Sequence, residues 1–185
     1  HYLAKHGERY EDKGALALVH ELTEAFQYYL ISASVQLAVE KGDGPGGKPG
    51  YCEGFKSTKY AAGILPIDTY KKDVDNLVPP NLKLDWEALR KSVLKFGMRN
   101  STLTAQMPSE SSSVVCNATN GIEPPRDFLT IKKSKKGTLK QIVPGYPRIK
   151  SGYTLLWDMP DMTGYLNVMA VIQKFFDQSI STNTS

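Results

Sequence analysis

The sequence predicts a helix-rich α/β protein, because stretches with helical and with strand patterns alternate along its 185 residues. Apolar side chains recur every three to four residues over 15–39, which predicts one long helix. Two short runs rich in apolar residues, 128–133 and 138–143, flank residues 134–137, which predicts one β-hairpin with glycine in the turn. We find no internal repeat, and the length suits one domain with a sizeable core.

The helix predicted over 15–39 should bury one face. Residues 40–59 are expected to follow as a flexible, glycine-rich loop, because the run 40–50 holds too much Gly and Pro to sustain a helix or strand. These glycines follow no strand and match neither P-loop nor GxGxxG spacing, so a plain surface loop is favoured over a phosphate cradle. The expected buried face of the helix comprises Ala15, Leu18, Val19, Leu22, Phe26, Tyr29, Leu30, Ala33 and Leu37.

Three shorter elements are predicted in the middle of the chain. Segment 65–77 should hold a short helix with Pro66 near its start, where a missing N–H costs little. Asp85 should cap the next helix, which ends at Gly97. Ser101–Gln106 is predicted to be a short strand. The helix after Asp85 is expected to bury Trp86, Leu89, Val93 and Phe96.

The last predicted helix covers 165–180 and takes Thr163 as its cap. It is apolar almost all round, so we expect it to lie inside a larger body. The chain begins at His1 rather than Met and opens with no apolar leader, which suggests a fragment or a processed chain. No apolar run reaches 18 residues, so no membrane-spanning helix is expected.

The charge balance excludes an obvious nucleic-acid binder. The net charge is +4, and the lysine cluster around the hairpin has no interleaved aromatic residues to stack bases. A solvated turn is therefore the favoured interpretation of that cluster. The cluster comprises Lys132, Lys133, Lys135, Lys136 and Lys140.

Cysteine and histidine are scarce and show no metal-binding pattern. The two cysteines, Cys52 and Cys116, are too few for a disulfide scaffold and form no CxxC, which favours a reducing cytoplasm. Cys52 is expected to be a bystander in the loop, and Cys116 to pack as a small apolar residue. The three histidines have no metal-ligand spacing, and His20 is expected on a helix surface.

The segment Ser101–Thr119 is the most informative candidate site. It is predicted to run from a strand through a serine-rich turn into a helix. The first N–H groups of a helix lack intrahelical partners and carry the positive end of its dipole, so small hydroxyl residues there can cradle a phosphate. The competing interpretation is that a serine simply caps the helix. The residue pattern alone favours the capping role, because serine is a common N-cap residue.

The run MPSESSSVVCNATNGIEPPR, Met107–Arg126, resembles a motif of the large catalytic subunit of class I ribonucleotide reductases. GILPIDTYKKDVD at 63–75, DWEALRKSVLKFGMRNSTLTAQMPSE at 85–110 and LLWDMPDMTGYLNVMAVIQKFFDQSISTNT at 155–184 resemble further segments of that subunit, in the same order. The resemblance covers most of residues 60–185, and residues 1–59 fit less distinctively.

The resemblance implies that the whole chain, 1–185, is part of the catalytic α/β barrel of that subunit. It also implies that the loop Pro108, Ser109, Glu110, Ser111 and Ser112 binds the substrate diphosphate. Glu110 would contribute mainly its backbone, and Ser111 and Ser112 would contribute N–H and hydroxyl groups. The implied reaction is radical reduction of ribonucleoside diphosphates to deoxyribonucleoside diphosphates for DNA synthesis. The implied partners are the remainder of the large subunit, a small radical-generating subunit and thioredoxin or glutaredoxin, with no membrane and no nucleic acid.

The cysteines that perform this chemistry in the family lie in motifs that the sequence lacks, so no catalytic residue is expected in the segment. The chain itself is expected to bind no cofactor; the parent enzyme would rely on a metal and radical in the small subunit and on nucleotide effectors. We therefore expect no turnover by the chain alone. It could be one subunit of a split enzyme, an incomplete piece, or a non-catalytic phosphate- or nucleotide-binding module.

Overall fold

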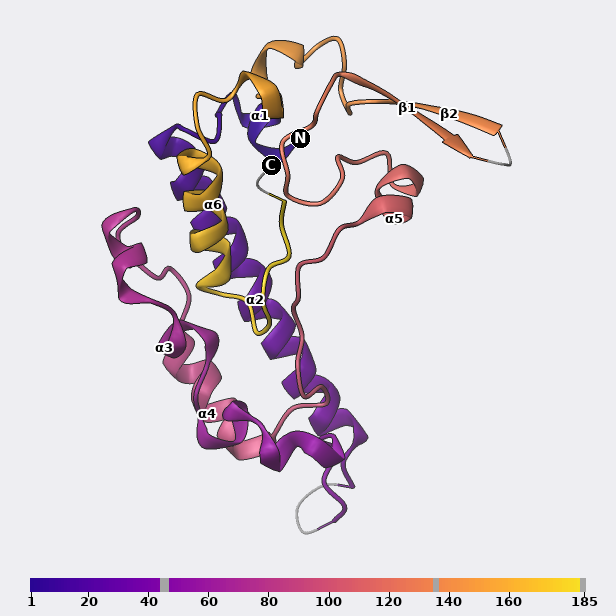
Figure 1. Ribbon diagram of the computed structural model, residues 1–185. Helices are drawn as coiled ribbons and strands as arrows, with labels where there is room; N and C mark the ends of the chain where they lie inside the picture. Colours follow the sequence, from indigo (N-terminus) through magenta and orange to yellow (C-terminus); the bar gives the residue numbers. More distant parts are fainter. Residues whose placement is uncertain (44–46, 135–136, 184–185) are drawn as a thin grey trace. The chain divides into compact units, whose positions relative to one another are not determined.

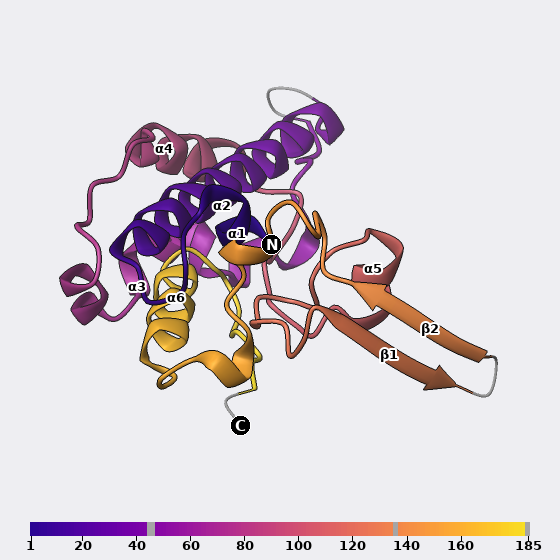
Figure 2. The same ribbon diagram turned by 90° about the horizontal axis from the view of Figure 1, so that it is seen from above.

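The computed structural model describes residues 1–43, 47–134 and 137–183, and the chain divides into two compact units. Unit 1 comprises His1–Leu18, Gln106–Met169 and Ile180–Ser185, and unit 2 comprises Val19–Ala105 and Ala170–Ser179. The elements follow the chain in Figures 1 and 2. The α-helices are α1 (Tyr2–His6), α2 (Lys13–Lys41), α3 (Pro66–Thr69), α4 (Trp86–Phe96), α5 (Glu110–Val115) and α6 (Thr163–Gln173). Short 3-10 helices occupy Glu53–Ser57, Lys59–Ala62, Lys72–Asn76, Lys150–Gly152 and Leu156–Asp158.

The predicted hairpin is confirmed by β1 (Leu129–Ser134) and β2 (Gly137–Ile142), which pair antiparallel from Leu129 opposite Ile142 to Ser134 opposite Gly137. The turn residues Lys135 and Lys136 lie outside the described residues. In the described ranges the two strands form a two-stranded sheet, so the expectation of a helix-rich chain with one hairpin is met. The described segments form no closed barrel wall.

The long helix is confirmed as α2, but its buried face is predicted only in part, since Ala15 and Val19 are buried as expected and other members are not. The expected residues Leu22, Phe26, Tyr29 and Leu37 are 41–61% exposed. Polar side chains are buried instead, because they bind partners within unit 2. Glu24 Oε1, for example, accepts hydrogen bonds from Lys83 N, Leu84 N and Trp86 Nε1 at 2.8–3.1 Å. The buried residues of the helix are Ala15, Leu16, Val19, His20, Thr23, Glu24, Gln27, Ile31, Ser34, Val35 and Ala38.

Helix α4 supplies much of the core of unit 2. Asp85 caps it as predicted, with its carboxylate accepting from Ala88 N at 2.9 Å. The Trp86 ring stacks on Phe175 with the centroids 6.2 Å apart. Phe96 was expected in this core but is exposed, because it is the last helical residue and lies beneath the Lys95 ammonium, 4.8 Å from its ring. Trp86, Leu89 and Val93 are buried as predicted.

The segment predicted as a loop over 40–59 is partly ordered into helix. Residues 44–46 lie outside the described residues, but Glu53–Ser57 forms a 3-10 helix that buries Phe55. Cys52 N donates to Met98 O at 3.0 Å, which ties the end of the loop to the chain after α4. The glycine-rich composition therefore describes only the first half of this segment.

Of two other segments, one is as predicted and one differs. The short helix expected within 65–77, with Pro66 near its start, is confirmed as α3, and the 3-10 helix Lys72–Asn76 follows it. The strand predicted over Ser101–Gln106 does not form; Gln106 makes only an isolated parallel bridge to Ile180. Thr104 O instead accepts from Gln178 N at 3.0 Å, in an irregular segment of unit 2.

The last helix begins two residues earlier than predicted and ends seven residues earlier. Thr163 is its first residue rather than its cap, and Asp161 Oδ1 accepts from Thr163 N at 2.7 Å. The helix ends at Gln173, and the predicted helical residues 174–180 are irregular because their polar groups bind elsewhere in unit 2. Most of its apolar side chains are buried, as expected for a helix that is apolar almost all round.

Candidate functional site

The predicted phosphate-binding segment forms the start of α5 in unit 1. Ser109 occupies the N-cap position, with φ −89° and ψ −11°, and its side chain makes no capping hydrogen bond. Ser112 binds back onto it twice, because its amide and its hydroxyl both donate to Ser109 O, at 2.9 and 2.6 Å. The plain capping role considered for serine is thus not what Ser109 does.

The side chains of Ser111 and Ser112 are exposed, whereas Ser113 is buried. Across the described residues, the amide of Ser111 donates no hydrogen bond, so its N–H is available to a ligand. The amide and hydroxyl of Ser112 are engaged with Ser109, which differs from the expectation that both serines offer N–H and hydroxyl groups. The side chain of Glu110 lies outside the described part of the chain.

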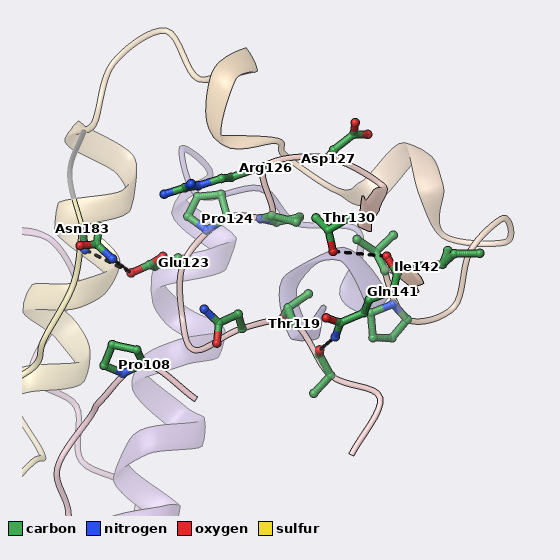
Figure 3. A pocket seen from close by; sticks show the side chains of 15 residues that line it. Pro108, Thr119, Glu123, Pro124, Arg126, Asp127, Thr130, Gln141, Ile142 and Asn183 are labelled. Atoms are coloured by element: carbon green, nitrogen blue, oxygen red, sulfur yellow. Dashed lines mark hydrogen bonds between the residues drawn. The ribbon is translucent and has the colours of Figure 1, made fainter. Parts of the chain in front are cut away.

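A cavity of about 420 Å³ lies in unit 1 beside this segment (Figure 3). Pro108 lines it, whereas Ser109, Ser111 and Ser112 do not. Its wall is mixed, with prolines and neutral polar side chains beside a few charged ones. The lining residues are Pro108, Ala118, Thr119, Asn120, Glu123, Pro124, Pro125, Arg126, Asp127, Thr130, Gln141, Ile142, Val143, Pro144 and Asn183.

Hydrogen bonds across the cavity wall join segments that are distant in sequence. Glu123 Oε1 accepts from both Asn183 N and Asn183 Nδ2, at 3.2 and 2.8 Å, as Figure 3 shows. Gln141 Nε2, on β2, donates to Ala118 O at 3.1 Å. The loop that follows α5 is therefore held by β2 through Ala118 and by Asn183 through Glu123.

Two buried tyrosines lie near the Glu123 carboxylate. Burial raises the pKa of Tyr165 to about 12, and the negative charge of Glu123 adds to the effect. Burial likewise raises the pKa of Tyr10, with Tyr165, Glu123 and Glu11 contributing in that order. Tyr10 donates its hydroxyl to Ile122 O at 2.8 Å. Both tyrosines are therefore neutral at physiological pH, and Tyr10 anchors the chain next to Glu123 through its hydrogen bond to Ile122 O.

The remaining candidates do not form a reactive centre. Cys116 is exposed just after α5, contrary to the expectation that it packs as an apolar residue, and Cys52 is partly buried against the core of unit 2. His20 is buried rather than on a helix surface. Among the described residues, no group of three or more His, Cys, Asp or Glu side chains could hold a metal ion.

Sequence reasoning missed Gln106, Glu123 and Asn183. Ser181 N donates to Gln106 O at 2.9 Å, and Asn183 binds Glu123 across 60 residues of chain. Neither pair belongs to a local pattern such as a cap or a helical repeat, so no signal in the sequence indicates that they meet.

None of the helices in the described ranges combines the length and the hydropathy that spanning a membrane requires.

Comparison with known proteins gives consistent matches. Residues 1–149 match the family model described as "Ribonucleotide reductase, barrel domain". The chain is 56% identical over 185 residues to "Ribonucleoside-diphosphate reductase subunit alpha" of Haemophilus influenzae and 55% identical to "Ribonucleoside-diphosphate reductase 1 subunit alpha" of Escherichia coli. The protein of Enterobacteria phage T4 with the same description is 43% identical. All or nearly all of this chain aligns, but it spans only 23% of the length of these relatives.

Proposed function

The chain belongs to the ribonucleotide reductase barrel-domain family, and on that premise we propose that it supplies the substrate-diphosphate loop and scaffold of a reductase large subunit. The reaction is the radical reduction of ribonucleoside diphosphates to deoxyribonucleoside diphosphates for DNA synthesis. The observation that carries this proposal is the exposed start of α5, which bears the motif Met107–Arg126.

The chemistry of this segment suits a diphosphate. Among the described residues, the amide of Ser111 donates no hydrogen bond, and the exposed hydroxyl of Ser111 adds a second donor. The hydroxyl of Ser112 is exposed too, but it already donates to Ser109 O. The helix has only six residues, so most of the attraction comes from these local groups rather than from a long dipole. The proposed diphosphate loop comprises Pro108, Ser109, Glu110, Ser111 and Ser112.

The chain needs other polypeptides for turnover. Its two cysteines are free and unsuited to the reaction, since Cys116 is exposed on the loop after α5 and Cys52 packs in the other unit. The thiyl radical and the reducing electrons must therefore come from outside it. We assign them to the remainder of the large subunit, to a small subunit with a metal and radical cofactor, and to thioredoxin or glutaredoxin. Nucleotide effectors would bind that remainder. We propose a cytoplasmic location, which the two unpaired cysteines support.

The exposed face of α2 fits the remainder of the large subunit as its partner. Between Glu21 and Glu40 the helix carries one charged residue, Glu24, and that residue is buried. Its outward face is therefore uncharged and largely apolar, and a face of this kind is typical of a protein–protein contact. In the relatives, the equivalent segment occupies 23% of a much longer chain, so other segments are available to cover it. The exposed apolar residues are Leu22, Phe26, Tyr29, Leu37 and Val39.

A reconstitution assay tests this proposal. The chain is mixed with a polypeptide carrying the rest of the large subunit, the small subunit, thioredoxin and a ribonucleoside diphosphate. We expect turnover only in the complete mixture. The double variant Phe26→Glu/Tyr29→Glu should abolish assembly and turnover, whereas Leu94→Glu, an equivalent change at an exposed position of α4, should preserve both. Turnover by the chain alone would contradict the proposal.

The alternative function is a non-catalytic phosphate- or nucleotide-binding module, favoured by the lack of suitable cysteines. Isothermal titration of the chain with pyrophosphate distinguishes the two when read beside the reconstitution. Binding that is lost in Ser111→Ala and Ser112→Ala, together with no turnover in the complete mixture, would support the module. Binding together with turnover would support the reductase.

A further inference from the structure

We propose that residues 180–183 act as a strap that fixes the geometry of the diphosphate loop, with Glu123 and Asn183 as positioning residues. The inference rests on the proposed function, because it concerns how the same loop is prepared for its ligand. Every contact that carries it lies within unit 1.

The strap holds the chain just before the diphosphate loop. Ile180 forms a parallel bridge with Gln106, and Ser181 N donates to Gln106 O at 2.9 Å. Gln106 is two residues from Pro108, where the loop begins. The Gln106 side-chain amide also donates to Met107 O at 3.0 Å, so it holds the backbone of the next residue. The entry to the loop is therefore attached to the strap through its backbone.

The other end of the strap holds the chain after the loop. The amide and the side-chain nitrogen of Asn183 both donate to the same oxygen of Glu123, at 3.2 and 2.8 Å. Hydrogen bonds to an ionised carboxylate are stronger than those between neutral groups. Glu123 follows α5 by eight residues, so the loop and its short helix lie between the two attachment points.

The two ends of the loop segment also lie beside one another. A Cβ placed on Gly121 would be 3.7 Å from Gln106 Nε2 and 3.8 Å from Met107 O. Gly121 has φ +60°, a left-handed conformation that glycine adopts without strain. The chain after α5 therefore comes back beside the residues that precede the diphosphate loop, and the strap contacts both of these segments.

This arrangement lowers the cost of ordering the loop when a ligand binds. Six helical residues in α5 are too few to be stable without support. Ordering a free loop on binding consumes part of the interaction free energy, whereas a loop held in advance avoids that cost. Neither Glu123 nor Asn183 belongs to the diphosphate loop itself. Loosening their contact should therefore weaken ligand binding without removing a ligand-binding group.

An exchange of the two side chains tests the strap. Asn183→Asp alone places two carboxylates together and should break the contact. The swapped pair Glu123→Gln/Asn183→Asp should restore it, because the amide and carboxylate then face each other in reverse. Asn120→Asp, at another exposed position of the same cavity wall, is the matched control for the added charge. Two properties are measured in each protein: amide hydrogen exchange at Ser181 and Asn183, and the dissociation constant for pyrophosphate.

We expect Asn183→Asp to speed exchange at both amides and to weaken pyrophosphate binding about three- to tenfold, in keeping with the loss of one or two hydrogen bonds. The swapped pair should recover most of both, and Asn120→Asp should change neither. In the reconstituted reductase, Asn183→Asp should raise KM for the diphosphate and leave kcat nearly unchanged.

The outcomes separate the strap from the proposed function. If the unchanged chain binds pyrophosphate and Asn183→Asp binds it equally well, the strap is refuted and the loop is not. Faster exchange with unchanged affinity would make the contact purely structural and would likewise refute the positioning role. A failure of the unchanged chain to bind pyrophosphate, alone or reconstituted, would overturn the proposed function and the positioning role together.

Discussion

Lys174 Nζ lies 3.0 Å from Asp75 Oδ1, and the Lys174 side chain is only 1% exposed. The Tyr70 hydroxyl donates to both oxygens of Asp75, at 2.9 and 2.8 Å, and the Lys174 ammonium lies 4.6 Å from the centre of the Tyr70 ring. The ammonium is thus withdrawn from water and neutralised mainly by one carboxylate. An ion pair of this kind is costly to break from one side, because the remaining charge cannot regain its hydration.

Removing Asp75 should lower the free energy of unfolding more than removing Lys174. Asp75→Asn leaves a buried ammonium without its counter-charge and should lower the free energy of unfolding by about 3 kcal/mol. Lys174→Met leaves a carboxylate that is partly exposed and still bound by Tyr70, so the loss should be smaller. Urea denaturation measures both.

The exposed pair Lys71–Asp73 provides the control for these variants. Its side chains are 82% and 73% exposed and its charges are 3.1 Å apart. Lys71→Met should cost less than about 1 kcal/mol. Combining Asp75→Asn with Lys174→Met should recover part of the loss from Asp75→Asn alone. An equal loss for the two single variants would show that burial of Lys174 does not set the energy of the pair.

Elements stabilised by nearby residues could be predicted from the sequence. The Asp85 cap acts three residues along the chain, on Ala88 N, and is placed correctly. The hairpin strands are joined by a short turn, so their pairing was also predicted, within one residue at each end. In these cases the pattern and the stabilising contact occupy the same short stretch of chain.

The buried face of α2 could not be predicted, because long-range polar contacts determine it. Gln27 donates to Tyr60, 33 residues away, and accepts from Thr104, 77 residues away. A prediction from apolar periodicity places a polar residue such as Gln27 on the outward face of the helix. The same limit applies to the end of α6, where Lys174 binds Asp75 across 99 residues, and to the contact between Glu123 and Asn183.

The loop sequence around Ser109 illustrates a different limit. The pattern of serines correctly places a helix start at this point, and the family resemblance assigns it a role. Neither indicates that Ser112 turns its hydroxyl onto Ser109 O rather than outward. Such a choice depends on local geometry that several serines in a row leave undetermined.

Acid should weaken unit 2 through Asp68. Burial alone would raise the pKa of Asp68, but hydrogen bonds from Arg90 and from Leu65 N hold it below its ordinary value. The carboxylate is therefore more acidic in the folded state, so its contribution to stability is complete above the unfolded value near 3.8 and is lost as the pH falls through the folded value. Urea unfolding at pH 7, 5, 4 and 3 should show a fall in stability below about pH 4.

Two variants isolate this contribution. Asp68→Asn removes the titrating group, and Arg90→Gln removes the partner that lowers its pKa. Both should be less stable than the unchanged chain at pH 7, and both should lose less stability on acidification. Profiles that stay parallel to that of the unchanged chain would assign the acid sensitivity to other carboxylates, such as Asp75, whose pKa is also lowered despite its burial, by hydrogen bonds from Lys174 and Tyr70.

His20 should produce a separate pH dependence near neutrality. Its ring is buried edge-on against Phe175, with centroids 4.9 Å apart, and in the described part of the chain its Nε2 has no hydrogen-bond partner. Burial lowers the pKa of His20 and the charge of Lys174 lowers it further. The other contributions, from Glu24 and Asp75 upward and from Lys83 downward, follow in that order.

A lowered histidine pKa means that the unfolded chain takes up the proton first. Stability should therefore fall as the pH drops below the unfolded value of 6.5. His20→Leu cannot titrate, so its free energy of unfolding should change less between pH 7.5 and 5.5. It should also be at least as stable as the unchanged chain at pH 7.5, because an unpartnered nitrogen is removed from the core. Equal changes with pH in the two proteins would exclude His20 as the source.

Gly97 should be much less tolerant of substitution than Gly7, although both have positive φ, +73° and +75°. Gly7 is in the left-handed helical region with ψ 17°, whereas Gly97 has ψ −170°, a conformation that is nearly exclusive to glycine. A Cβ on Gly97 would lie 2.7 Å from Tyr51 Cδ1, whereas one on Gly7 would meet nothing within 4 Å. Gly7→Ala should therefore cost only the backbone strain of about 1 kcal/mol. Gly97→Ala adds a steric clash and should cost about 3 kcal/mol in total.

Thermal and urea denaturation of Gly7→Ala and Gly97→Ala measure the difference. The double variant Gly97→Ala/Tyr51→Ala should lose the clash, and a Gly97→Ala penalty that persists undiminished in the Tyr51→Ala background would show that strain alone accounts for it.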